Sequence, residues 1–139
     1  MDWESCCGRR IAKKVQVDDA LISSLRKASS NKFVSQKQLP LTSITASSKI
    51  SLAYDSLREL LEALALQKGY KIYNHECYTP FLREVVKKSD FADEFDQLRR
   101  LRNAVNYYGE EFSVEETKNI IGRIASLRNT ILPLSDRNV

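Results

Sequence analysis

The spacing of the apolar residues is the feature that most constrains how this 139-residue chain can fold. Apolar side chains recur every three or four positions, and no sustained run alternates with a period of two. The clearest stripe runs through the middle of the chain and comprises Ile50, Ala53, Tyr54, Leu57, Leu60, Leu61 and Leu64. Positions three and four apart share one face of a helix, so this pattern predicts an all-α fold.

Start and stop signals delimit the first two helices. Asp18 or Asp19 is placed to cap the first helix, and Pro40 stops it. Its apolar stripe is expected to consist of Val17, Leu21, Leu25 and Ala28. The second helix contains the stripe described above. We expect Thr42 or Ser43 to cap it, and Lys68-Gly69 to end it.

Three more helices follow. Asn74 caps a short one whose apolar side is Tyr78, Phe81, Leu82 and Val85. The next runs from about residue 90 to residue 108, ends at Gly109, and has the stripe Phe91, Phe95, Leu98, Leu101 and Val105. Ser113 and Glu116 form a capping box that opens the last helix. Since the connections are short, we predict an up-and-down four-helix bundle with an additional short helix.

The bundle is expected over residues 17–132, between a basic, flexible or frayed N-terminal arm (1–16) and a polar C-terminal tail (133–139). The net charge is +4, and the basic excess lies in the first third of the chain. The odd cysteine count, from Cys6, Cys7 and Cys77, favours a reducing compartment, and Cys6 and Cys7 are expected to be incidental cysteines of the frayed terminus. We find no signal peptide and no membrane span, which predicts a cytoplasmic protein.

The single histidine of the chain limits the kinds of metal site and catalysis that the sequence can support. His75 is the single histidine of the chain, whereas metal sites and acid/base catalysis usually draw on two or more imidazoles. No CxxC or HExxH spacing, phosphate loop or Ser-His-Asp set is present. We therefore expect no metal and no cofactor, and assign His75 a structural role at the start of its helix.

Arg102 breaks the apolar stripe of its helix. It lies eleven positions after Phe91, which places it about 20° round from that residue. An arginine there must find a carboxylate, hydrogen bonds or a solvent-filled cleft, or else its stem snorkels at the helix edge. Arg99 and Asn106 fall on the same side, so the three form a polar strip beside the core.

Charged residues of the second helix are candidate partners for this strip. Asp55, Glu59 and Glu62 fall away from the apolar stripe and are expected to form a solvated face, with Arg58 at its border able to pair with Glu62. Asp55, Arg58 and Glu59 are predicted to support the Arg102 site, with Asp55 or Glu59 able to neutralise the arginine.

Two stretches resemble HEPN-domain proteins. SLAYDSLRELLEALALQKGYKIYNHECYTPFL, residues 51–82, is similar to the leucine-rich helix, GYK turn and following helix of that family. FDQLRRLRNAVNYYGE, residues 95–110, resembles its signature helix, in which an arginine, often followed by asparagine, precedes a histidine by four to six residues. Arg102 and Asn103 match the first part. The histidine does not match, because positions 107–109 hold Tyr107, Tyr108 and Gly109.

The resemblance implies a helical bundle, usually a homodimer, whose signature helices line a cleft for nucleotide or RNA. Many family members are metal-independent ribonuclease toxins paired with a nucleotidyltransferase-like antitoxin. The preferred hypothesis is a catalytically weak or inactive dimer whose ligand-binding residues are Arg99, Arg102, Asn103 and Asn106. An active ribonuclease using Arg102 with Tyr107 or His75 is the second hypothesis. A purely structural interaction subunit, in which a carboxylate neutralises Arg102 across the dimer, is the third.

Overall fold

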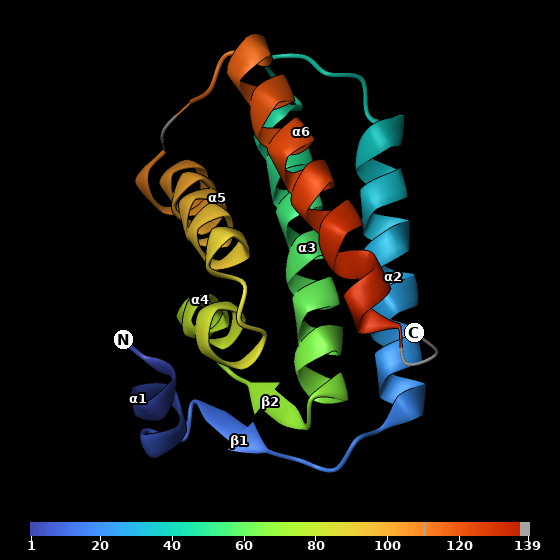
Figure 1. Ribbon diagram of the computed structural model, residues 1–139. Helices are drawn as coiled ribbons and strands as arrows, with labels where there is room; N and C mark the ends of the chain where they lie inside the picture. Colours follow the sequence, from blue (N-terminus) through green and yellow to red (C-terminus); the bar gives the residue numbers. More distant parts are fainter. Residues whose placement is uncertain (110, 137–139) are drawn as a thin grey trace.

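Four long helices build the molecule shown by the computed structural model, which describes residues 1–109 and 111–136 except for the side chains of Tyr107 and Tyr108. They run alternately up and down and pack as a bundle (Figure 1). The four are α2 (Asp19–Gln38), α3 (Ala46–Gln67), α5 (Ser89–Tyr108) and α6 (Val114–Ile131). The prediction of an all-α helical bundle is confirmed.

Helix α3 is the centre of the bundle, with α2, α5 and α6 all packed against it (Figure 1). It is therefore buried on nearly every side rather than along one stripe. The expected solvated face of Asp55, Glu59 and Glu62 is wrong in this respect: Glu59 is buried and forms an ion pair with Lys32 of α2. A charged side chain on a central helix must find such a partner, since an unpaired buried charge is costly.

Helix α2 begins and ends as predicted but buries a different face. The Asp18 side chain accepts a hydrogen bond from the Leu21 amide at the N-cap, and the helix ends at Gln38, two residues before Pro40. Val17 and Leu21 are exposed. The face packed toward α3 comprises Ile22, Ser29, Phe33 and Gln36. The predicted stripe is therefore wrong for Val17 and Leu21, whereas Leu25 packs against Ile22, Ala63 and Leu66.

The connection from α2 to α3 does not use the expected cap. Thr45 is the N-cap position of α3 and makes no side-chain capping bond, while the Thr42 hydroxyl accepts bonds from nearby amides within the turn. Lys49 instead joins the two helices. Its buried ammonium donates to the Leu39 carbonyl at 2.7 Å and to the Gln36 carbonyl, which satisfies acceptors at the end of α2.

The capping predictions for the last two long helices are confirmed. Gly109 closes α5 with a φ of 65°, in the left-handed region that favours glycine. Ser113 and Glu116 form the capping box of α6, each side chain accepting from the other's backbone amide. After α6 the chain forms a 3₁₀ turn, η3 (Leu132–Ser135), in which Ser135 is buried; residues 137–139 of the expected polar tail lie outside the described residues.

A small antiparallel sheet forms from the predicted N-terminal arm and the predicted connector after α3, and the spacing of apolar residues did not predict it. Strand β1 (Ala12–Lys14) pairs with β2 (Tyr70–Ile72), with Ala12 opposite Ile72. Three-residue strands are too short to show an alternating pattern in the sequence. After β2 come η1 (His75–Cys77), α4 (Tyr78–Pro80) and the π-helical turn η2 (Phe81–Val85). Asn74 caps η1 as predicted, accepting from the Glu76 amide.

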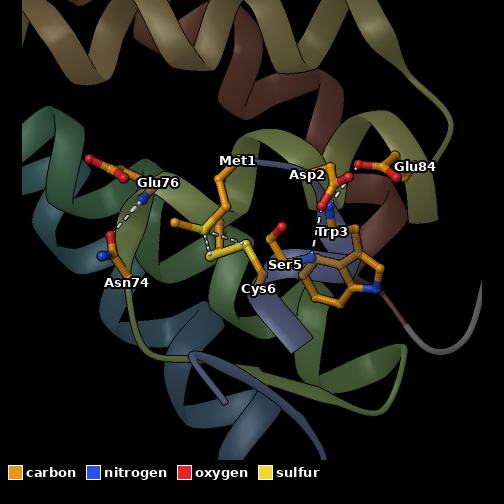
Figure 2. Close-up of a disulfide and its surroundings, with 9 residues drawn as sticks. Met1, Asp2, Trp3, Ser5, Cys6, Asn74, Glu76 and Glu84 are labelled. Atoms are coloured by element: carbon orange, nitrogen blue, oxygen red, sulfur yellow. Dashed lines mark hydrogen bonds between the residues drawn. A yellow bond between two sulfur atoms is a disulfide. The ribbon is translucent and has the colours of Figure 1, made fainter. Parts of the chain in front are cut away.

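The N-terminal arm is folded onto the bundle instead of being frayed. Helix α1 (Trp3–Gly8) precedes β1, and a disulfide joins Cys6 to Cys77 of η1 (Figure 2). The Trp3 amide donates to the Glu84 carboxylate at 2.8 Å, and its ring lies against Tyr70 and Phe81. The expectation of an incidental cysteine is therefore wrong for Cys6. Among the described residues, no helix is both long and apolar enough to cross a membrane.

Candidate functional site

Arg102 lies on the side of α5 that faces α3, where two residues of α3 contact it. Its guanidinium sits over the Tyr54 ring, 5.1 Å from the ring centroid, and its Nη2 lies 3.5 Å from Asp55 Oδ1. The side chain is 15% exposed, and its buried Nε has no hydrogen-bond partner. Arg102 therefore keeps an unsatisfied donor and makes a single long contact to Asp55, not a closed bidentate pair.

Arg99 lies one turn earlier on α5 and repeats this arrangement. Its Nη2 donates to Asp96 at 3.0 Å, its Nη1 is 3.9 Å from Glu76, and its buried Nε also lacks a partner. Although burial opposes the effect, hydrogen bonds from Arg99 and Arg100 lower the pKa of Asp96. The strip predicted on α5 thus holds two arginines, each with one buried N–H donor unsatisfied.

His75 belongs to the same site, because its Nδ1 is 3.4 Å from the Tyr54 hydroxyl. Burial, followed by the positive charges of Arg58, Arg102 and Arg99, lowers the pKa of His75 to about 4, while Asp55 opposes the shift. The imidazole is therefore neutral at pH 7, and it lies in a positive electrostatic potential. We call Arg58, Arg99, Arg102, Tyr54 and His75 the arginine cluster.

The course of the chain after α3 brings His75 to Tyr54, the residue on which Arg102 sits. Helix α3 ends at Gln67, the chain turns at Gly69, and strand β2 (Tyr70–Ile72) leads to η1, whose first residue is His75. A strand within GYKIYN that runs back along α3 would predict His75 beside Tyr54, whereas a short connector does not.

Two predicted ligand-binding residues lie along α5 beyond Arg102. Asn106 is exposed and accepts a hydrogen bond from the Ser51 hydroxyl at 3.1 Å. Asn103 is half-buried. The side chain of Tyr107, the candidate catalytic residue, lies outside the described residues.

The supporting residues predicted on α3 pair with different partners. Asp55 contacts Arg102, and Arg58 pairs with Glu62 at 3.5 Å, where Lys71 also binds the same carboxylate. Glu59 is not part of the site, because it pairs with Lys32 of α2. Asp55 and Glu59 are one helical turn apart, and their carboxylates pair with different neighbouring helices, α5 and α2.

The chemistry available here is anion recognition. The arginine cluster offers buried guanidinium donors without acceptors, next to a neutral imidazole. Burial raises the pKa values of Tyr54 and Tyr78, so both phenols stay protonated at neutral pH. Among the described residues, no group of three or more His, Cys, Asp or Glu side chains is arranged to hold a metal ion.

Acidification tests the environment of His75. Its pKa is lower in the folded chain than the 6.5 of a free imidazole, so the unfolded chain binds more protons as the pH falls below 6.5. We expect this to remove about 1 kcal/mol of the free energy of unfolding by about pH 5, after allowing for the partial exposure of the ring. Urea denaturation at pH 7 and at pH 5 measures this loss of free energy of unfolding. The loss should be smaller in His75→Gln than in the parent protein. An equal loss would contradict the lowered pKa of His75.

Comparisons with known proteins do not name a family for this fold and site. No protein-family model, curated protein or solved structure matches the chain.

Proposed function

We propose that the chain is a HEPN-like protein whose arginine cluster binds a phosphate group of a nucleotide or RNA, and that its catalytic activity is weak or absent. The observation that carries the proposal is the pair of buried, unpartnered Nε donors on Arg99 and Arg102. A phosphate oxygen is an acceptor that would satisfy them, and arginine binds phosphate with charge-assisted hydrogen bonds. The positive potential that lowers the pKa of His75 favours the same ligand.

The proposal extends to assembly. A homodimer that joins two copies of α5 would bring two arginine clusters together, and a nucleotidyltransferase-like antitoxin is the proposed partner. In this proposal the protein works in the cytoplasm, where a reducing environment would open the Cys6–Cys77 disulfide and remove the covalent tie between α1 and η1. Sedimentation equilibrium of the purified protein, with and without reductant, tests the dimer; a monomer at every concentration would contradict that part.

Loss of RNA binding in Arg102→Ala is the central test. Removing one charge-assisted phosphate contact is expected to weaken binding of a fluorescein-labelled RNA at least tenfold, as measured by fluorescence anisotropy at low salt. Arg100→Ala is the matched control, since Arg100 is on the same helix but 72% exposed and pairs with Asp96. That variant should bind within about twofold of the parent protein.

Two outcomes would contradict the proposal. If Arg102→Ala binds RNA as tightly as the parent, the arginine cluster is not the site. If Arg100→Ala weakens binding as much as Arg102→Ala, the effect is general electrostatic attraction to a basic protein. In the first case, Asp55 neutralising Arg102 within the same chain would favour a structural role for the pair.

Metal-independent RNA cleavage is a second candidate, favoured by the placement of His75 within the arginine cluster. A neutral imidazole can accept a proton from a ribose hydroxyl while Arg102 stabilises the phosphate. Its low pKa makes it a weak base, which is why binding is preferred over catalysis. Incubating structured RNA with the protein and EDTA decides the matter: cleavage that disappears in both His75→Ala and Arg102→Ala supports an enzyme, and intact RNA contradicts it.

A further inference from the structure

A groove runs between α2 and α6, which both pack on α3. Its volume is about 540 Å³, a size typical of small-molecule sites. Phe33 of α2 and Ile121 and Ala125 of α6 supply apolar walls. Lys37, Lys118 and Arg128 also line it, and none of its lining residues is acidic. The groove shares no residue with the arginine cluster.

Arg128 is the unusual member of this lining, because it is 7% exposed and has no counter-ion among the residues that the structure describes. Its Nε donates to Ser56 at 2.8 Å, and its Nη2 donates to Ser30 at 3.0 Å. The guanidinium also stacks on Phe33, 5.2 Å from the ring centroid. Within the described part of the chain no carboxylate lies at ion-pair distance from it, and burial lowers its pKa.

Gln36 gives a second, independent sign of an incomplete site. This side chain lines the same groove and is 2% exposed, yet its buried Oε1 has no hydrogen-bond partner. Buried amides and buried guanidinium groups are normally satisfied, because an unpaired polar atom costs free energy. Gln36 is the exception in hydrogen bonding, whereas Arg128 is hydrogen-bonded to serine hydroxyls but has no carboxylate beside it among the described residues. Both residues line one groove, which indicates that a ligand completes the site.

We propose that the groove binds a small amphipathic organic anion, with its charged head against Arg128 and its apolar body along Phe33, Ile121 and Ala125. An anionic head supplies the counter-charge that the hydroxyls of Ser29, Ser30 and Ser56, which accept hydrogen bonds from Arg128, do not. The apolar body replaces water along the walls of the groove. A carboxylate and a phosphate present the same chemistry to Arg128, and the probes below distinguish them. The site is independent of the proposed phosphate site on α5.

Isothermal titration calorimetry with octanoate, octyl phosphate and octan-1-ol tests the proposal, since the three share one apolar chain and differ in the head group. We expect octanoate or octyl phosphate, whichever has the preferred head, to bind at least tenfold more tightly than octan-1-ol. Arg128→Gln should lose this preference while still binding octan-1-ol. Equal affinity for the anions and the alcohol, or no detectable binding of any of them, would overturn the proposal.

Because Arg128→Gln removes a buried contact and could disturb the fold, a second variant blocks the groove without touching Arg128. Gly122 lines the groove on α6, and a Cβ atom added there meets no atom within 4 Å. Gly122→Leu should therefore fold and reduce the affinity of the preferred anion at least tenfold. Ser126→Leu is the matched control, as Ser126 is exposed on the same helix and outside the groove. Unchanged binding in Gly122→Leu, or an equal loss in Ser126→Leu, would contradict the assigned location.

Discussion

Breaking the Cys6–Cys77 disulfide is expected to lower the free energy of unfolding by about 4 kcal/mol. The two cysteines are 71 positions apart, and a cross-link that closes a long loop removes much of the conformational freedom of the unfolded chain. It also ties α1 and the N-terminal part of the chain to η1 (Figure 2). Urea denaturation of Cys6→Ser beside the parent protein measures the loss.

Trp3 reports the same event spectroscopically, because it is the chain's single tryptophan and lies 5.1 Å from the Tyr70 ring and 5.6 Å from the Phe81 ring. Release of α1 should expose the indole and shift its fluorescence to longer wavelength. Cys7→Ser is the matched control, since Cys7 is a neighbouring free thiol. If Cys7→Ser destabilises the protein as much as Cys6→Ser does, the cross-link is not the source of the stability.

Phe95→Ala is the second change with a large expected effect, a loss of about 3–5 kcal/mol in the free energy of unfolding. The ring is fully buried, stacks on Tyr54 at 5.9 Å between centroids, and meets Tyr78 edge-on at 6.0 Å. Removing it leaves a cavity beneath Tyr54, the residue that contacts both Arg102 and His75. RNA binding should weaken as well, even under conditions in which the variant is folded.

Phe91→Ala is the comparison for that experiment. Phe91 lies one turn earlier on the same apolar stripe, but it is half-buried, and Lys88 lies over its ring at 5.9 Å. We expect a loss of about 1 kcal/mol, because a partly exposed ring gives up less buried area. Thermal and urea denaturation of both variants measure the difference. Equal losses would contradict the described burial of the α5 stripe.

Local signals in the sequence predicted the helices because the residues concerned act within their own turn. The Asp18 cap, the Ser113 and Glu116 capping box, the stop before Pro40 and the left-handed Gly109 all act on backbone groups a few positions away. Short strands gave no such signal. Ala12 and Ile72 pair across 60 positions, and each strand has three residues.

The candidate site was predictable in part. Arg102 was visible because a charge in the middle of an apolar stripe demands a partner, and Asp55 was named among the carboxylates able to supply one. His75 was assigned a structural role on another element, and its contact with Tyr54 depends on the direction in which the chain returns after α3. The sequence did not predict that Arg128 and Gln36 are buried, because their burial depends on which helices pack against the faces that hold them.

By itself the sequence determined the helical class of the fold, most helix ends and the anomalous arginine of α5, since periodicity and capping are properties of one segment. The tertiary structure decided which faces are buried. It placed α3 at the centre, turned Ser29 and Phe33 of α2 inward instead of Leu21, and sent Glu59 to Lys32 rather than to Arg102. These outcomes depend on contacts between distant segments, and helices with more than one usable face do not specify in advance which neighbour covers each face.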